Sequence, residues 1–226
     1  MSFKILYVTA TGTEAEALRS IKGLDQSEGC YTAGNAEIFL LITGVGSVST
    51  AWSMMEWISR NGKPDLAING GIAGSFNHDI HIGEVVAPAN DCFADSGIED
   101  RDSFKTLFEA GLQDENEFPF VSGKIPADSF YLNRMKSILK PVNAITVNTA
   151  TGSESAIIKL VNKFNPDIET MEGATFFYIC TREKIPFLAL RAISNRVEPR
   201  NKDNWKIHTA LQNLSEKLNE VIIRLE

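Results

Sequence analysis

The chain has little of what disulfide frameworks and metal sites require, with 3 cysteines and 3 histidines among 226 residues. Cys30, Cys92 and Cys180 are an odd number, lie far apart and form no C-x-x-C pair, so we expect reduced thiols in a reducing compartment. His78 and His81 are three residues apart, but no further cysteine or histidine completes a metal-ligand set with them. We therefore expect no disulfide bond and no metal site.

Basic charge and long apolar runs are also scarce. Lysine and arginine number 22 against 29 aspartates and glutamates, a net charge of −7, whereas a surface that tracks nucleic-acid phosphates needs a basic stripe. No apolar run reaches membrane-spanning length, and the N-terminal run is too short for the apolar core of a signal peptide. We expect a cytoplasmic protein that acts on a small molecule, with no nucleic-acid or membrane partner.

What the chain does have is an alternation of strand-like and helix-like segments with glycines between them. Its apolar content of 43% and charged content of 23% are ordinary for a globular protein, and its length suits a single domain over residues 1–226. Strands are predicted at 4–9, 36–43, 65–69, 83–87, 144–148 and 185–193, and helices at 14–21, 49–60, 153–164 and 209–225. This order predicts an α/β sheet covered by helices on both faces.

The segment 95–125 is the exception to this alternation. It is polar, with charges crowded at 99–102 and an acidic run at 114–117, and it shows no helical or strand periodicity. We interpret it as a surface insertion and a candidate lid.

Two late segments carry polar groups at predicted strand ends. Glu172 lies in a Met-Glu-Gly-Ala segment at a strand-to-helix junction, while Arg191, Ser194 and Asn195 follow an apolar run. In open α/β sheets ligands bind at the carboxyl ends of strands, so we expect a site for a hydrogen-bonding small molecule here. For Arg191 the alternative is a buried ion pair with a core carboxylate, because a buried arginine needs a partner.

A second carboxylate, Glu14, follows the first predicted strand in the first turn of a helix. There it could serve only to complement the helix dipole. Glu14 and Glu172 together, from two different strand ends, are what hydrolysis of a glycoside requires. One carboxylate activates water, and the other steadies a sugar that becomes oxocarbenium-like.

Two glycine-rich segments also follow predicted strands. Gly44-Val-Gly46 fails the dinucleotide-binding fingerprint, because Ser49 stands where the third glycine belongs; it could hold an anion or a ribose, or be a plain turn. Asn69-Gly-Gly-Ile-Ala-Gly74 could form a backbone wall against a ligand, or a tight turn with positive φ angles.

Aromatic and cationic side chains follow Asn195. Trp205 could form one wall of a pocket or plug the core under the last helix. Arg196, Arg200 and Lys206 could meet an anionic substituent of a ligand or lie in solvent.

Taken in order, these segments resemble the nucleoside phosphorylase/nucleosidase superfamily across nearly the whole chain. The matching segments are Glu14, Thr43-Gly-Val-Gly46, Asn69-Gly-Gly-Ile-Ala-Gly74, Gly83-Glu-Val-Val86, Thr151-Gly-Ser153, Met171-Glu-Gly-Ala174 and Arg191-Ala-Ile-Ser-Asn195. The resemblance implies a three-layer α/β/α sandwich around a mixed, partly barrel-like central sheet. It also implies no cofactor, and a homo-oligomer, a dimer or larger, in which a neighbouring chain helps to close the substrate pocket.

The resemblance further implies a role for each site residue. Glu14 activates water, Glu172 and Met171 hold the ribose, and Arg191 supports this sugar site. Asn195, helped by Ser194, holds the base. The remaining substrate-binding positions are Gly46, Ala73, Gly74, Thr149, Ala150, Arg200 and Trp205.

The loop before Glu14 has no cation until Arg19, whereas phosphorylases of the superfamily carry phosphate-binding arginines near the first strand, so the chain is more similar to the nucleosidases. Asn195 departs from the methylthioadenosine/S-adenosylhomocysteine nucleosidases, which have aspartate there. An amide accepts from a protonated purine N7 and donates to a 6-oxo group at the same time.

A 6-oxopurine nucleosidase with these motifs resembles the futalosine hydrolase family, which releases hypoxanthine from futalosine on a route to menaquinone. Asn195 argues against adenine as the base but does not separate futalosine from inosine. An inosine-type or methylthioadenosine-type nucleosidase and a non-catalytic nucleoside-binding protein remain as alternatives. A flavodoxin-like or dinucleotide-binding protein is disfavoured by the missing fingerprint.

Overall fold

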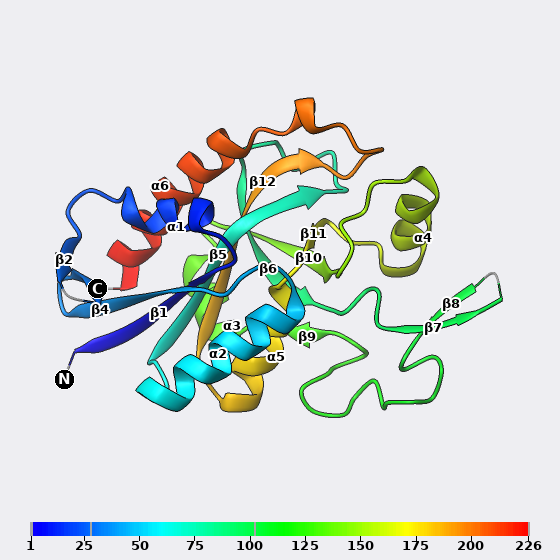
Figure 1. Cartoon of the computed structure of the whole chain (residues 1–226), viewed down its shortest axis with the longest axis horizontal. Helices are drawn as coiled ribbons and strands as arrows, with labels where there is room; N and C mark the ends of the chain where they lie inside the picture. The colour runs from blue at the N-terminus through cyan, green and yellow to red at the C-terminus, as the bar shows by residue number, and fades with distance from the viewer. Residues whose placement is uncertain (1, 28, 102, 226) are drawn as a thin grey trace.

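The structure, a computed structural model, describes residues 2–27, 29–101 and 103–225. Five strands form a closed, barrel-like ring at its centre (Figure 1). They are β5 (Leu66–Ser75), β6 (Val85–Asp91), β10 (Lys140–Thr146), β11 (Ile168–Thr170) and β12 (Phe187–Arg196). Their order is β11-β10-β6-β12-β5, and a further pairing of β11 with β5 closes the ring. Parallel and antiparallel pairs both occur, so the predicted mixed, partly barrel-like sheet is confirmed.

The sheet continues from β5 through four more strands. They are β1 (Phe3–Thr9), β4 (Ala36–Ile42), β3 (Cys30–Ala33) and β2 (Asp25–Ser27). In β1 successive side chains point to opposite faces, as the strand period requires. Ile5 and Tyr7 therefore join one apolar cluster, while Leu6 and Val8 join the other.

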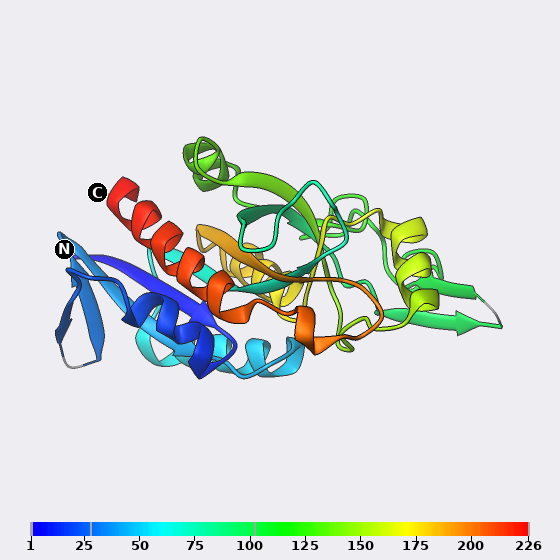
Figure 2. The same ribbon diagram turned by 90° about the horizontal axis from the view of Figure 1, so that it is seen from above.

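Helices cover both faces of the sheet (Figure 2), as the alternating sequence pattern predicted. On one face α1 (Gly12–Arg19) packs with α6 (Ile207–Leu225), and on the other α2 (Ser47–Asn61) packs with α5 (Gly173–Glu183). The remaining helices are α3 (Ser129–Met135), α4 (Glu154–Phe164) and the short 3₁₀ turn η1 (Lys202–Asn204). Within residues 2–27, 29–101 and 103–225, none of the helices combines the length and apolar character needed to cross a membrane.

Three strands run further than their sequence patterns predicted. β5 was expected to end before its glycines, yet Gly70, Gly71 and Gly74 lie inside it, and none has a positive φ angle. The reason is close packing rather than turning: a Cβ at Gly70 would lie 2.2 Å from Oη of Tyr7, and one at Gly71 would lie 2.8 Å from Oε1 of Glu14.

β6 and β12 show the same extension. β6 continues through Pro88 to Asp91; its ladder to β12 involves only Val85 and Val86, so the proline lies beyond that ladder. β12 continues through the polar cluster to Arg196, with a bulge at Ser194 between the pairings of Ile193 and Asn195 with β5. The polar groups thus belong to the strand itself.

The boundaries of other elements shift by a few residues. The helix expected at 14–21 is α1, which begins at Gly12 because Thr11 caps it, and ends at Arg19. The strand expected at 144–148 is β10, which ends at Thr146. The short elements β2, β3, β7 (Gly97–Asp100), β8 (Ser103–Thr106), β9 (Ile125–Pro126) and α3 were not predicted.

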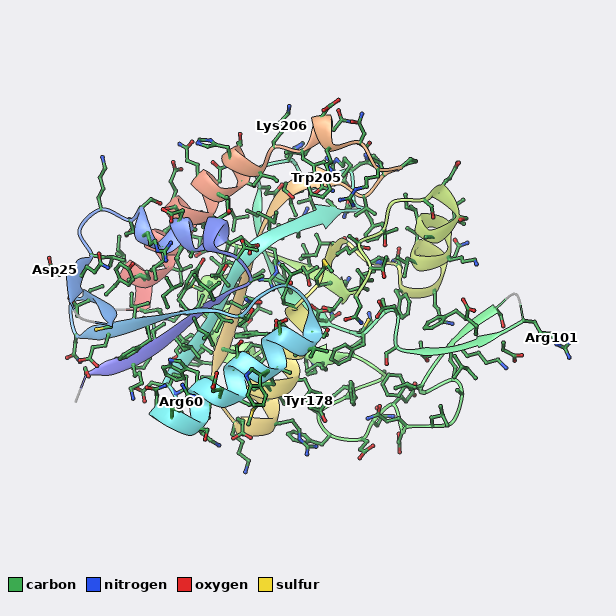
Figure 3. All side chains as sticks on the ribbon, in the orientation of Figure 1. Asp25, Arg60, Arg101, Tyr178, Trp205 and Lys206 are labelled. Atoms are coloured by element: carbon green, nitrogen blue, oxygen red, sulfur yellow. The ribbon has the colours of Figure 1, made fainter. Side chains whose placement is uncertain are left out.

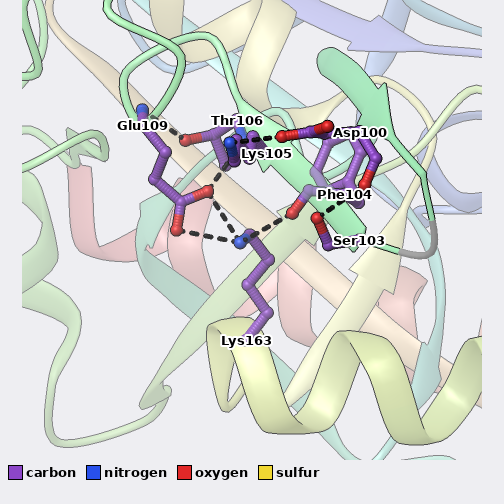
Figure 4. Close-up of polar contacts among 7 residues, drawn as sticks. All are labelled: Asp100, Ser103, Phe104, Lys105, Thr106, Glu109 and Lys163. Atoms are coloured by element: carbon purple, nitrogen blue, oxygen red, sulfur yellow. Dashed lines mark hydrogen bonds and ion pairs between the residues drawn. The ribbon is translucent and has the colours of Figure 1, made fainter.

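Most of the segment 95–125 is ordered on the molecule's edge, and residue 102 lies outside the described part. A hairpin of β7 (Gly97–Asp100) and β8 (Ser103–Thr106) forms its own two-stranded sheet, while β9 (Ile125–Pro126) pairs with β6. Lys163 of α4 clamps the hairpin, donating to Oε1 of Glu109 at 2.9 Å and to the carbonyl of Phe104 at 3.1 Å (Figure 4). The hairpin extends away from the central ring (Figure 1), as a surface insertion does.

Candidate active site at the strand ends

A cavity of about 360 Å³ opens where β1, β5, β11 and β12 meet the loops and helices that follow them. Its volume is in the range of small-molecule sites. The carboxyl ends of parallel strands converge here, which is where ligands bind in α/β sheets. Of the predicted site residues, Glu14, Ala73, Gly74, Ala150, Met171, Glu172, Ser194, Asn195, Arg200 and Trp205 line it. Among its described lining residues, none comes from the segment 95–125, so that segment does not act as a lid in this conformation.

Glu14 combines two tasks that the sequence presented as alternatives. It closes a capping box with Thr11 at the start of α1, and its Oε2 accepts from the Thr11 N–H at 3.1 Å and the Thr11 hydroxyl at 3.0 Å. Its Oε1 accepts from the N–H of Ile72 at 3.0 Å, 58 residues away. A carboxylate that only complemented a helix dipole would not need this second anchor, and the two together hold Glu14 rigidly at the cavity wall.

Glu172 is the N-cap residue of α5, at the strand-to-helix junction that was predicted for it. Its Oε1 accepts from the N–H of Gly46 at 2.9 Å. Burial raises the pKa of Glu172, while the Gly46 N–H and the positive charge of Arg191 act in the opposite direction. Gly46 itself does not line the cavity; it fixes the carboxylate that does.

Arg191 lies beneath the site and is 2% exposed. Its Nη1 donates to the carbonyls of Asn69 and Leu190, both at 2.9 Å, and its Nη2 donates to Oδ1 of Asn69. Its hydrogen-bond partners are therefore neutral oxygens rather than the core carboxylate of the ion-pair alternative. Burial lowers the pKa of Arg191, and the nearby carboxylates of Glu172 and Glu14 act against that lowering. The guanidinium charge therefore still interacts with both acids.

Asn195 stands in β12 with both ends of its amide oriented. Oδ1 accepts from the hydroxyl of Ser194 at 2.8 Å, and Nδ2 donates to the carbonyl of Arg196 at 2.7 Å. Because a carbonyl can only accept, these partners fix which end of the amide is which. One N–H and one lone pair of the amide remain for a ligand.

Gly74 lies in the cavity wall beside Asn195. A Cβ at this position would lie 2.8 Å from Cγ2 of Val197 and 3.2 Å from Nδ2 of Asn195, so the place of a side chain here is taken by two neighbouring side chains of the same wall. Ala73, the preceding residue, is buried at 3% exposure and also lines the cavity. That this segment forms a backbone wall against a ligand stays a prediction.

The predicted residues Thr149 and Ala150 lie where two cavities meet. Ala150 and Thr151 line both the central cavity and a second hollow between the β7–β8 hairpin and α4, whereas Thr149 lines the second hollow and not the central cavity. The turn from β10 to α4 therefore contributes Ala150 and Thr151 to the site.

Trp205 and Arg200 lie at the outer end of the cavity. The Arg200 guanidinium stacks over the indole ring, with its Cζ 5.4 Å from the ring centroid, a geometry in which cation and aromatic face attract. Figure 3 shows Trp205 beside Lys206 on the segment that leads into α6. Lys206 is exposed and does not line the cavity, so Arg200 is the better placed of these two cations.

Two buried acids were not predicted. Glu169 in β11 lines the cavity at 8% exposure, and Asp91 at the end of β6 is fully buried with Oδ2 unpartnered. Burial raises the pKa of Asp91 to about 7. Their only sequence signal was a charged residue inside an apolar strand pattern, the same signal that drew attention to Arg191.

This arrangement suits hydrolysis of an N-glycosidic bond. Two carboxylates, Glu14 and Glu172, come from different strand ends to one cavity, and Arg191 balances their charge from below. Asn195 offers one donor and one acceptor to a ligand in the cavity. The described residues hold no cluster of three or more metal-binding side chains.

Comparison with known proteins places these features in context. A family model described as "Phosphorylase superfamily" matches residues 4–225. The futalosine hydrolase of Acidothermus cellulolyticus is 31% identical over 229 residues, covering 95% of this chain and 88% of that protein. The 5'-methylthioadenosine/S-adenosylhomocysteine nucleosidase of Buchnera aphidicola subsp. Schizaphis graminum is 29% identical over 175 residues, covering 70% of this chain and 66% of that protein.

Solved structures show the same fold. The structure of futalosine hydrolase from Helicobacter pylori strain 26695 superposes with a TM-score of 0.81, covers 97% of each chain and is 18% identical. The closed five-stranded ring with its covering helices is therefore an architecture that this protein shares.

Proposed function

This chain belongs to the phosphorylase superfamily, and from that premise we propose that it is a nucleosidase that hydrolyses the N-glycosidic bond of futalosine. The products are hypoxanthine and dehypoxanthine futalosine, on a route to menaquinone. The observation that carries the proposal is the oriented amide of Asn195 in a cavity that also holds Glu14 and Glu172.

Glu14 acts as the general base. Its Oε2 is occupied by Thr11, and its Oε1 accepts one hydrogen bond from Ile72, which leaves a lone pair of Oε1 to orient a water. As the C1′–N9 bond breaks, its electron pair goes to the base, the water oxygen bonds to C1′ and a proton of that water passes to Glu14. A carboxylate here also repels phosphate, which favours hydrolysis over phosphorolysis.

Glu172 and Met171 hold the sugar. The Glu172 carboxylate accepts from the ribose hydroxyls, and its negative charge stabilises the oxocarbenium-like transition state. Arg191 supports this site from below through Asn69. The positive charge of Arg191 acts against the rise in the Glu172 pKa that burial causes, and so favours the ionised carboxylate that the sugar requires.

Asn195 holds the leaving base, with Ser194 orienting its amide. As the base leaves, its N7 takes a proton from solvent water, because the amide of Asn195 cannot supply one. Oδ1 of Asn195 then accepts from N7–H of hypoxanthine, and Nδ2 donates to O6. Adenine presents a 6-amino donor at the second position, which would face the donor Nδ2. A site with buried polar groups rejects a ligand that leaves them unpaired.

The 5′ substituent of futalosine ends in a benzoate, and we place it against Trp205 with Arg200 at its carboxylate. The stacked pair at the outer end of the cavity supports this placement, since guanidinium recognises carboxylate through paired hydrogen bonds. An inosine-type nucleosidase would use the same base and sugar site without this contact.

A homo-oligomer that closes the pocket is also part of the proposal. One face of α2 exposes Val48 (83%), Trp52 (70%) and Met55 (42%), three apolar side chains at helical spacing. Val45, 53% exposed and at the lip of the cavity, continues this face. Exposed apolar patches of this kind mark interaction sites, and a second copy docked here would border the substrate.

The test measures base release from futalosine, inosine and methylthioadenosine in phosphate-free buffer. The released base is quantified by chromatography. The proposal expects fast hypoxanthine release from futalosine and slow release from the other two. If only inosine reacts, the placement of the 5′ substituent against Trp205 and Arg200 is wrong. Activity that appears only on addition of phosphate would identify a phosphorylase and overturn the role of Glu14. Binding without turnover of any of the three would favour a nucleoside-binding protein.

A further inference from the structure

The first turn of α5 is capped by two threonines and not by its own N-cap residue. The N–H of Gly173 donates to Oγ1 of Thr170 at 3.2 Å, and the N–H of Ala174 donates to Oγ1 of Thr146 at 2.7 Å. Glu172, the N-cap residue, makes no side-chain hydrogen bond to the helix. The two threonines thus satisfy backbone donors that an N-cap side chain ordinarily satisfies.

Strand pairing brings the two hydroxyls together beneath this helix. Thr146 is the last residue of β10 and Thr170 is the last residue of β11, and the two stand opposite each other in the parallel ladder. Their Oγ1 atoms lie 3.3 Å apart. Both residues are buried, at 1% and 5% exposure, so the bonds that they accept from α5 are shielded from solvent.

Asp91 fixes the direction of the Thr146 hydroxyl. Its Oδ1 accepts from that hydroxyl at 2.9 Å. A hydroxyl has one hydrogen and two lone pairs, so Thr146, which donates to Asp91, faces the N–H of Ala174 as an acceptor. A Cβ at Gly173 would collide with Oδ2 of Asp91 and lie 2.9 Å from Oγ1 of Thr170. The network therefore packs directly against the backbone of the first helical residue.

Capping by hydroxyls leaves the Glu172 carboxylate for other partners. A carboxylate is a stronger acceptor than a hydroxyl, and a helix N-terminus attracts negative charge, so open N–H groups of α5 would draw Glu172 toward its own helix. With two of these groups satisfied, Oε1 of Glu172 accepts from the N–H of Gly46 instead, and Glu172 lines the cavity.

We propose that Thr146 and Thr170 are positioning residues, which cap α5 in place of Glu172 and thereby keep the Glu172 carboxylate available to the ribose hydroxyls. This inference rests on the proposed function, which assigns Glu172 to the sugar. Thr170 borders the cavity, whereas Thr146 is not among its described lining residues. A change at Thr146 therefore reaches a bound nucleoside only through other residues, which makes Thr146 the better position to test.

The competing explanation is that Thr146 only stabilises the fold. The two explanations differ in recognition of the sugar, which we would measure by calorimetric titration of inosine and 2′-deoxyinosine. All proteins in this titration carry Glu14→Gln, so that neither nucleoside is hydrolysed. With Thr146 in place, inosine should bind about 10-fold more tightly than 2′-deoxyinosine, the value of one hydrogen bond to a carboxylate.

Thr146→Val opens the N–H of Ala174 to the Glu172 carboxylate and should bring this ratio of affinities close to 1. A purely structural loss would weaken both nucleosides by the same factor and leave the ratio as it was. An unchanged ratio in Thr146→Val therefore overturns the inference.

Two further variants separate the Thr146 hydroxyl from the packing around it. Thr146→Ser keeps the hydroxyl and should keep the preference for inosine; a ratio near 1 in this variant would assign the effect to packing and overturn the inference. Thr175→Val is the matched control on α5, because the buried Thr175 hydroxyl has no hydrogen-bond partner among the described residues. It should leave the ratio unchanged, and a loss equal to that of Thr146→Val would also overturn the inference.

The N–H of Gly46 supplies a measurement that needs no ligand. Hydrogen exchange followed by NMR spectroscopy reports how well this amide is protected. In Thr146→Val it should exchange at least about 10-fold faster than in the wild-type protein, relative to the amides of β1, because Glu172 leaves it for α5. Thr146→Ser should exchange like the wild-type protein. Unchanged protection of Gly46 in Thr146→Val would contradict the proposed competition for Glu172.

Failure of this inference is distinguishable from failure of the proposed function. If futalosine is cleaved and Thr146→Val keeps the preference for inosine, only the positioning role of the threonines falls. If futalosine is not cleaved, yet Thr146→Val changes the sugar preference and the Gly46 exchange as expected, the positioning role stands and the futalosine assignment falls. Equal binding of inosine and 2′-deoxyinosine with Thr146 in place would overturn this inference together with the sugar role of Glu172.

Discussion

The N–H of Gly46 donates to Oε1 of Glu172 at 2.9 Å, joining residues 126 positions apart in the chain. Gly46 has a φ angle of +91°, a conformation that residues with a Cβ rarely adopt. The turn between β4 and α2 thereby presents its N–H to the carboxylate that we assign to the ribose. The glycine segment that the sequence offered as an anion or ribose site, or as a plain turn, thus positions another side chain of the site.

Replacing Glu14 with glutamine should abolish base release while leaving ligand binding intact. An amide cannot take a proton from water, and loss of a general base costs about 10²- to 10⁴-fold in rate. The measurements are hypoxanthine release from futalosine and calorimetric binding of the same nucleoside to the inactive variant. Glu16→Gln, at an exposed position two residues further along α1, is the control and should retain activity. Full activity in Glu14→Gln would show that Glu14 is not the general base.

Gly71→Ala should lower kcat without unfolding the protein. The new Cβ would lie 2.8 Å from Oε1 of Glu14, and the carboxylate, at the end of a flexible side chain, is what can move. A displacement of about 1 Å at a catalytic group can cost about 10²-fold. Gly12→Ala, where the added Cβ meets nothing within 4 Å, is the matched control. Similar melting temperatures with unequal activities are expected; equal activities would contradict the requirement for a glycine at 71.

Arg200→Ala should raise KM for futalosine more than KM for inosine, because only futalosine carries a carboxylate to meet the guanidinium. We expect a factor of about 10 for futalosine, the value of a charge-assisted hydrogen bond. Steady-state kinetics give KM for both substrates. Lys202→Ala, in the same exposed segment, is the control and should leave both KM values unchanged. Equal changes for the two nucleosides would disprove the placement.

Asp91→Asn should stabilise the protein increasingly as pH rises from 5 to 8. Burial raises the Asp91 pKa from 3.8 to about 7, so the folded state binds a proton that the unfolded state has released. The stability associated with this group is fully present below about pH 4 and is lost as pH rises through 7. The variant lacks this loss, which is about 3 kcal/mol between pH 5 and pH 8, or on the order of 10 degrees in melting temperature.

Thermal melts of the wild-type protein and Asp91→Asn at several pH values provide the measurement. The quantity of interest is the difference in melting temperature between the two proteins. Asp79→Asn, an exposed change, should give a difference that stays flat with pH. A flat difference for Asp91→Asn as well would show that Asp91 does not titrate as described.

Trp52→Glu should shift the protein to a smaller species in sedimentation equilibrium, if the exposed face of α2 joins two copies. A charge placed in an apolar contact must be desolvated without a partner. Ile223→Glu on α6, where the native side chain is also exposed at 59%, is the matched control and should leave the mass unchanged. A wild-type protein that sediments as a monomer would exclude this part of the proposal.

The helices and strands with strong periodicity were predictable from local pattern. β1, β4, α2, α4 and α6 are found within two residues of their expected bounds, because residue type and the spacing of apolar side chains are local signals of strand and helix. β5 was misjudged because glycine is usually read as a breaker, whereas here Gly70 and Gly71 make room for Tyr7 and Glu14. That requirement lies in residues far away in the sequence and leaves no local signal.

The amino-acid sequence by itself determined the α/β class, the strand ends that carry the site, and the identities of Glu14, Glu172 and Asn195, since hydrophobic period and residue type are local properties. Only the tertiary structure decided that the strands close into a ring, that Arg191 bonds to Asn69, and that Glu169 and Asn195 both pair with Gly74. Strand pairing between distant segments sets these relationships, because register fixes which side chains share a face.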